Sequence, residues 1–205
     1  MYEVQDRGPR RFIPEIRESA ILEAFLVSTG IVALAEIGDK TRLLALVLAA
    51  RYRRPLPIVF GILFATLANH ALAAWLGAWI TGLTGPDAMR WILGASFLAM
   101  AAWSLVPDRL DEGEAKSVRL GAFGATLVAF FLVEMGDKTQ VATVALAARY
   151  VSIATVVAGS TLGMMLANVP AVVLGERLLR RVPAKAVRRV AAAIFALLGA
   201  LALAS

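Results

Sequence analysis

Ionisable and hydroxyl side chains interrupt two apolar stretches of this chain in the same order. Residues 36–52 read EIGDKTRLLALVLAARY, and residues 134–150, which lie 98 positions later, read EMGDKTQVATVALAARY. Each copy holds two carboxylates, a lysine and a threonine. Ionisable groups within an apolar segment are costly unless they are paired or functional. Their repetition therefore indicates a functional site that is built from two copies of one motif.

The acidic residues of each copy have a spacing that suits a shared site. Glu36 and Asp39 are three residues apart, and so are Glu134 and Asp137. On a helix this spacing places both carboxylates on one face. If the two copies face each other across a pseudo-twofold axis, four carboxylates converge. Such oxygen ligands suit hard divalent ions, namely Ca²⁺, Mg²⁺ and Mn²⁺.

The charge of the two copies favours exchange of an ion for protons. Each copy carries two acids and one lysine, a net charge of −1, so that one divalent ion would neutralise the pair. The same carboxylates can instead accept protons. A site that holds either a metal ion or protons meets the minimum requirement of an exchanger. Because the chain has no cysteine, thiolate metal sites and thiol catalysis are excluded.

Other polar residues beside the acids are candidates for accessory roles. Neutral oxygens can come from Thr41, Thr139 and Gln140, and amide oxygens from Asn69 and Asn168, which recur in both halves. For the two asparagines, hydrogen bonding between helices is an equal alternative. We interpret Lys40 and Lys138 as structural counter-ions, because an ammonium group repels a metal ion. They would hold the carboxylates once the metal has left.

Two basic residues lack a counterpart in the other half. Arg42 stands where the second copy has Gln140. If Arg42 faces the site it weakens ion binding, and we favour the alternative that it extends to the membrane rim or pairs with Asp39. His70 is the single histidine, and a hydrogen-bonded core residue is favoured over a proton relay.

The composition indicates that these residues are carried by membrane helices. The 205-residue chain is 60% hydrophobic and has a mean hydropathy of +0.74, well above soluble domains. Its net charge of +6 comes from short basic clusters between apolar runs, which indicates a membrane-facing rim and no nucleic-acid partner. We therefore predict an all-α polytopic membrane protein.

The apolar runs predict six transmembrane helices, arranged as two inverted three-helix repeats. The expected domains are an amino-terminal arm (1–19), a first repeat (20–106), a polar linker (107–119) and a second repeat (120–205). The expected spans are 20–50, 56–80, 91–106, 120–148, 151–175 and 190–204. The first and fourth are too long for one straight crossing, and we expect a kink or break at the motif, at Gly38 in the first copy. Gly159 and Gly163 have the spacing of a close helix contact.

The distribution of basic residues predicts the orientation. Outside the motifs, the segments after the first, third and fifth spans hold 12 Lys and Arg, against 6 for the arm, the other two loops and the tail. The positive-inside rule then places both termini outside the cytoplasm.

The duplicated E-φ-G-D-K-T motif, followed each time by A-A-R-Y, resembles the GDT family of divalent cation/proton exchangers. That family includes bacterial manganese exporters and Golgi manganese/calcium transporters, and the resemblance covers residues 20–204. It implies inverted repeats and cation ligands at Glu36, Asp39, Glu134 and Asp137. This sequence departs from the family at Arg42, where glutamine is usual.

We therefore expect a secondary transporter, not an enzyme, that exports Mn²⁺, with Ca²⁺ as a second candidate ion. The compact length favours a bacterial type in the inner (cell) membrane. An exporter of amino acids or another small metabolite stays open as an alternative, because lysines and carboxylates are both present. A channel and an intramembrane enzyme are less favoured, the latter because no H-E-x-x-H, Ser-Lys or His-Asp arrangement occurs. Purely structural ion pairs within each motif are also less favoured, since buried pairs stabilise poorly.

Overall fold

The computed structural model describes residues 12–37, 39–106, 120–150, 152–175 and 183–204, and within these ranges the chain forms helices and no strand. Gly38, where we expected the first break, and the predicted linker 107–119 lie outside the described residues. The helices, in chain order, are α1 (Phe12–Glu36), α2 (Lys40–Tyr52), α3 (Pro55–Leu83), α4 (Pro86–Ser104), α5 (Gly121–Glu134), α6 (Lys138–Arg149), α7 (Ile153–Leu174) and α9 (Ala184–Ala204).

Each motif separates two helices of a predicted span. The first expected span consists of α1 and α2, and the fourth consists of α5 and α6, so the predicted interruption at each motif is confirmed. In the second motif the chain turns at Gly136, whose φ of +83° lies in the left-handed region that favours glycine. The Gln140 side chain accepts a 2.6 Å hydrogen bond from the Gly136 backbone N–H and so supports this turn.

The described helices have the length and composition of a membrane protein. Four segments are long and apolar enough to cross a bilayer, namely Glu18–Glu36, Pro55–Leu83, Ile153–Leu174 and Lys185–Ala204, and Gly121–Glu134 is apolar but shorter. Large apolar side chains such as Leu56, Trp75 and Val173 are more than half exposed on the outside of the bundle. Such a surface is compatible with lipid and not with water.

Several helices begin earlier than the apolar runs predicted. Helix α4 begins at Pro86, directly after Gly85, because proline is favoured in the first turn of a helix; we had assigned this Gly-Pro pair to a turn. Helix α9 begins at Ala184 and includes basic residues that we had placed in a loop, since Lys, Arg and Ala all favour helix. Helix α1 begins at Phe12, within residues 1–19 that we had assigned to an arm.

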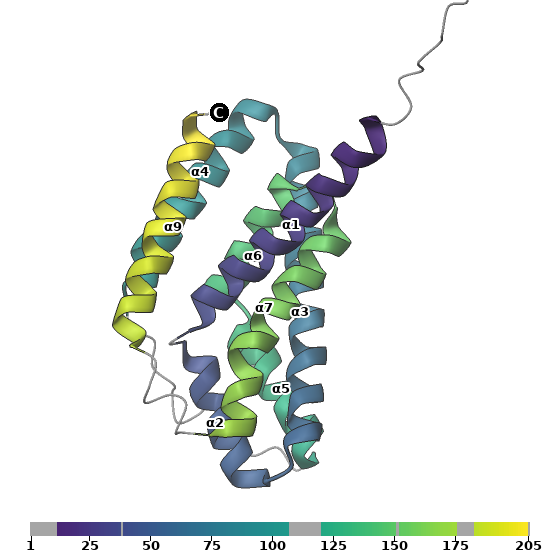
Figure 1. Ribbon diagram of the computed structural model, residues 1–205, viewed down its shortest axis with the longest axis vertical. Coiled ribbons are helices and arrows are strands. Elements are labelled where there is room, and N and C mark those ends of the chain that lie inside the picture. Colours follow the sequence, from purple (N-terminus) through teal and green to yellow (C-terminus); the bar gives the residue numbers. More distant parts are fainter. Residues whose placement is uncertain (1–11, 38, 107–119, 151, 176–182, 205) are drawn as a thin grey trace, which may run out of the picture.

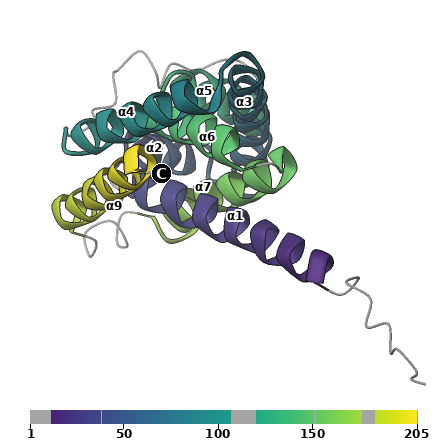
Figure 2. The same cartoon turned by 90° about the horizontal axis from the view of Figure 1, so that it is seen from above.

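The helices form an elongated bundle in which α4 and α9 pack together beside the other six described helices (Figure 1). The view from above shows the same pair to one side of the bundle (Figure 2). Helix α1 packs on α7, and α3 packs on α5, α6 and α7. The start of α1 and the end of α9 lie at the same end of the bundle (Figure 1).

Glycines allow two close helix contacts that correspond between the halves. A Cβ added to Gly159 on α7 would lie 2.6 Å from the carbonyl oxygen of Phe25 on α1. A Cβ added to Gly61 on α3 would lie 2.9 Å from the carbonyl oxygen of Phe123 on α5. Each glycine and each phenylalanine has its counterpart 98 positions away in the sequence. The expected contact at Gly159 is thus confirmed, and it occurs twice.

Two clusters of buried apolar side chains hold the bundle together. One contains residues of α1, α3, α4, α6, α7 and α9, and the other contains residues of α2, α3, α5 and α7. Each interrupted span therefore contributes one half to each cluster. The breaks at residues 37–39 and 135–137 occur where the chain passes from one cluster to the other.

Candidate cation site

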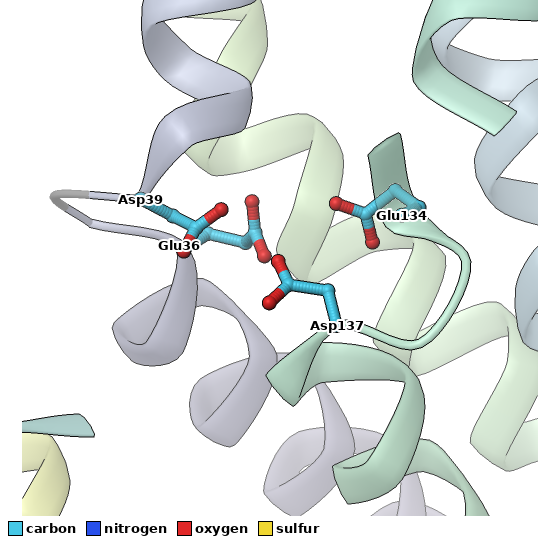
Figure 3. A group of neighbouring side chains, drawn as sticks. All are labelled: Glu36, Asp39, Glu134 and Asp137. Atoms are coloured by element: carbon cyan, nitrogen blue, oxygen red, sulfur yellow. The ribbon is translucent and has the colours of Figure 1, made fainter. Parts of the chain in front are cut away.

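The four acidic residues of the two motifs meet inside the bundle. Glu36, Asp39, Glu134 and Asp137 each offer a carboxylate oxygen that lies within 4.8 Å of the others. Figure 3 shows the four side chains pointing toward one another from the two chain breaks. Their exposed fractions are 0, 2, 0 and 5%. The structure thus brings together all four residues that the sequence predicted as a group.

The local backbone that produces this arrangement is nearly the same in both motifs. Each glutamate is the last residue of a helix, and each aspartate is the N-cap of the next helix. The φ and ψ angles are −83° and 163° at Asp39, and −82° and 170° at Asp137. The aspartate N–H donates to the glutamate carbonyl at 3.0 Å in the first motif and 3.1 Å in the second.

This geometry corrects our reason for expecting the acids together. We had placed Glu36 and Asp39 three residues apart on one continuous helix face, and that is wrong because the helix ends between them. The tight turn brings the two carboxylates together instead. An aspartate at a helix N-terminus lies beside the positive end of the helix dipole. The glutamates end helices, where carbonyl groups without helical partners favour a cation.

Hydroxyl groups one turn further on hold the glutamates in both motifs. Thr41 Oγ1 donates to Glu36 Oε2 at 2.5 Å, and Thr139 Oγ1 donates to Glu134 Oε2 at 2.9 Å. Both threonines are buried. We had listed them among neutral oxygens near the ion, and in this structure they orient the carboxylates that would hold it.

The amide residues contribute unequally. Asn168 Nδ2 donates to Glu36 Oε2 at 3.4 Å, so this residue touches the acidic group. Asn69 Nδ2 instead donates to the carbonyl oxygen of Phe131 at 3.0 Å, which ties α3 to α5. The side-chain oxygens of both asparagines are buried without a hydrogen-bond partner. Gln140 bonds the turn at Gly136 and supports the backbone of the second motif.

Each acid of the site has one buried carboxylate oxygen without a hydrogen-bond partner among the described residues, namely Oε1 of Glu36, Oδ1 of Asp39, Oε1 of Glu134 and Oδ2 of Asp137. The ammonium group of Lys138 lies 3.0 Å from Oδ1 of Asp39. A buried carboxylate oxygen without a partner is strongly unfavourable. A cation or protons would satisfy these oxygens.

The observed ion pair differs from the pairs that the sequence suggested. We had considered Arg42 as a partner of Asp39 within one motif, and the structure instead gives Asp39 a lysine from the other motif. Arg42 is 5% exposed, so the expectation that it reaches a rim is wrong. Lys40 is half-buried in the first turn of α2. The cross-motif pair could not be read from the sequence, because it depends on how α2 and α6 are placed.

Two residues outside the group also depart from expectation. His70 is fully buried, and neither ring nitrogen has a hydrogen-bond partner, so the hydrogen-bonded core residue that we favoured is not observed. The His70 side chain is not a member of the four-carboxylate group. Tyr150, the last residue of the repeated A-A-R-Y, donates a 3.1 Å hydrogen bond to Glu23 on α1. Our sequence reasoning had left this contact out.

Comparisons with known proteins agree with this chemistry. Residues 24–112 and 122–205 match the family described as "Divalent cation/proton antiporter GDT1". A Vibrio cholerae protein named "Putative manganese exporter" is 51% identical over 179 residues, which cover 87% of this chain and 89% of that protein. A GDT1-like protein of Synechocystis is 30% identical, covering 85% of this chain and 94% of that protein.

More distant relatives occur in plants. A GDT1-like protein of Oryza sativa is 27% identical, covering 85% of this chain and 71% of that protein. No solved structure matches the chain significantly. Since the family match covers most of the chain and includes both motifs, the protein is a transporter and not an enzyme. The chain belongs to the GDT1 family of divalent cation/proton antiporters.

Proposed function

We propose that this protein exports Mn²⁺, with Ca²⁺ as a second candidate ion, in exchange for protons. The proposed ligands are Glu36, Asp39, Glu134 and Asp137. The observation that carries this proposal is the convergence of the four buried carboxylates within 4.8 Å, together with one buried oxygen on each of them that has no hydrogen-bond partner among the described residues. The name of the Vibrio cholerae relative supports manganese as the cargo.

The size of the acidic group supports a divalent ion. Calcium–oxygen distances are about 2.3–2.6 Å, so oxygens on opposite sides of the ion are about 4.6–5.2 Å apart. The carboxylate oxygens here already lie within 4.8 Å of one another. An amino acid, the alternative cargo that the sequence left open, is far larger than this spacing.

The buried charges support exchange for protons. Among the described residues the buried ionisable side chains are four acids, Arg42, Lys138 and His70. With His70 neutral and the other six ionised, they carry a net charge of −2. One divalent ion neutralises this charge. Protons on the carboxylates can neutralise it as well, so that either cargo allows the site to close away from water.

The proposed architecture is a pair of inverted three-helix repeats. The matching contacts of Gly61 and Gly159 support it, because each joins the middle helix of one half to the interrupted span of the other. The two motif turns with nearly equal backbone angles support it too. In such transporters the substrate site lies near the membrane midplane between the repeats.

We place the protein in the bacterial inner membrane with both termini outside the cytoplasm. The excess of Lys and Arg in the segments after the first, third and fifth spans supports this orientation. The common end of the bundle at which α1 begins and α9 ends is compatible with it (Figure 1). The bacterial source of the two relatives with at least 30% identity supports the compartment.

Metal efflux from everted membrane vesicles tests the proposal directly. Vesicles that contain the protein should accumulate radioactive Mn²⁺ when their interior is made more acidic than the medium. Unlabelled Mn²⁺ should compete with the labelled ion better than Mg²⁺ does. Replacing any ligand by its amide, Glu36→Gln, Asp39→Asn, Glu134→Gln or Asp137→Asn, should abolish uptake at unchanged expression. The matched control is Glu18→Gln, which changes an exposed acid on α1.

The outcomes separate the candidate functions. Retained uptake in Asp39→Asn or Asp137→Asn would reject the proposed ligand set. Uptake that is independent of the pH gradient would reject proton exchange. Uptake of labelled amino acids without uptake of metal, if it is lost on the same four replacements, would favour the metabolite exporter.

A further inference from the structure

The two aspartates of the site occupy matching positions but have different surroundings. Lys138 Nζ lies 3.0 Å from Asp39 Oδ1, and the exposed fractions of the two side chains are 4 and 1%. Oδ2 of Asp137 has no partner. Asp39 caps α2 and Lys138 is the first residue of α6, so the ion pair joins the first motif to the second.

The contact between Lys138 and Asp39 is one that a mobile cation can replace. It is an ion pair by distance, yet Asp39 Oδ1 accepts no hydrogen bond, so the contact lacks the directional component of the strongest pairs. The lysine side chain has a flexible stem of four carbons, so that its ammonium group can move away from Asp39 by a change of rotamer. A metal ion bound by all four carboxylates would repel the ammonium group and take its place beside Asp39.

We propose that Lys138 is a resident counter-ion that competes with the transported ion for Asp39. When the site holds no metal, the ammonium group compensates one of the four carboxylates. When a divalent ion enters, it first meets the carboxylates of Glu36, Glu134 and Asp137, and Asp39 joins the ligand set only after Lys138 has moved away. Lys138 thereby weakens ion binding and favours release. This inference rests on the proposed function of the site.

Metal affinity of purified protein in lipid nanodiscs tests this competition. Equilibrium binding of radioactive Mn²⁺ is measured for the wild type, Lys138→Gln and Lys138→Met; the Met variant keeps the side-chain length without its charge. Both replacements should bind Mn²⁺ at least about tenfold more tightly, which corresponds to about 1.4 kcal/mol. They should also release it more slowly. Lys138→Arg, which keeps the charge, should bind as the wild type does.

Two matched controls make the result specific to the ion pair. Lys185→Gln changes an exposed lysine at the start of α9, away from the four acids, and should alter the affinity less than threefold. In the Asp39→Asn background, Lys138→Gln should tighten binding less than it does in the wild type, because only the direct repulsion between the ammonium group and the metal ion is then relieved. A lysine with a merely structural role would not show a tightening that depends on Asp39.

The failures of the two proposals are distinguishable. If the wild type binds Mn²⁺ but both neutral replacements of Lys138 bind equally or more weakly, the counter-ion inference is overturned while the cation site stands. The same holds if the tightening is equally large with Asp39→Asn. If the wild type binds neither Mn²⁺ nor Ca²⁺, the proposed function is overturned, and the inference that rests on it fails as well.

Discussion

Replacing Gly159 by alanine should destabilise the bundle and disturb the site at the same time. The added Cβ would lie 2.6 Å from the Phe25 carbonyl oxygen and 3.1 Å from Ser28 Cβ. Carbon–oxygen contacts of this kind normally measure about 3.3 Å or more, so α7 and α1 must separate by about 0.7 Å. Overpacking of this size costs about 1–3 kcal/mol.

A control in the same bundle isolates the packing effect. Gly30 on α1 would place its Cβ in open space, with no atom within 4 Å. Alanine there should stabilise the helix by up to about 1 kcal/mol, because alanine has the higher helix propensity. The two variants should therefore differ by about 1–4 kcal/mol in free energy of unfolding. For a chain of this length that corresponds to roughly 2–16 °C in melting temperature.

Tryptophan fluorescence during heating of the purified protein in detergent measures this difference. Gly61→Ala changes the matching position of the other half. Its melting temperature should resemble that of Gly159→Ala and not that of Gly30→Ala. Mn²⁺ binding should weaken in Gly159→Ala as well, because separating α1 from α7 lengthens the 3.4 Å contact of Asn168 with Glu36. Equal melting temperatures for Gly159→Ala and Gly30→Ala would refute the close packing of α1 on α7.

Two further predictions concern single side chains. Thr41→Val and Thr139→Val should each weaken Mn²⁺ binding about tenfold, since each removes a hydrogen bond to a carboxylate. Thr81→Val, which removes a hydrogen bond to a backbone carbonyl, should leave binding unchanged. Equal affinities of the three variants in titration calorimetry would contradict this prediction. His70→Leu should raise the melting temperature by a few degrees and retain efflux, because it removes two buried ring nitrogens without partners. Loss of efflux by a stable His70→Leu variant would instead make this histidine a proton relay.

The repeated motif was enough to predict the acidic group and both chain breaks. Carboxylates, glycine and threonine recur in the same order within apolar runs, and only a functional site explains that cost. The positions of Gly159 and Gly163 likewise predicted a close helix contact, which the structure places against α1. These features are local, or they repeat in the sequence, and therefore can be recognised without knowing which helices are neighbours.

Features that depend on which helices meet could not be predicted in the same way. Asp39 has a basic residue three positions later in its own motif, Arg42, yet its partner is Lys138, 99 positions away. The helix start at Pro86 was missed for a different reason. A Gly-Pro pair is compatible with a turn and with the first turn of a helix, and packing against α9 selects the helix.

The two apolar clusters suggest how the site can be opened without unfolding it. Because α1 and α6 belong to one cluster and α2 and α5 to the other, a movement of one cluster relative to the other changes the angle between α1 and α2 and the angle between α5 and α6. Helices α3 and α7 contribute to both clusters and must slide or bend along their length. Packed cores resist deformation, whereas breaks between half-helices absorb it at low cost. Glu36 and Asp137 would move with the first cluster, at the end of α1 and the start of α6, and Glu134 and Asp39 with the second. Any such movement therefore separates two carboxylates from the other two and weakens their hold on an ion, so that opening and release are one event.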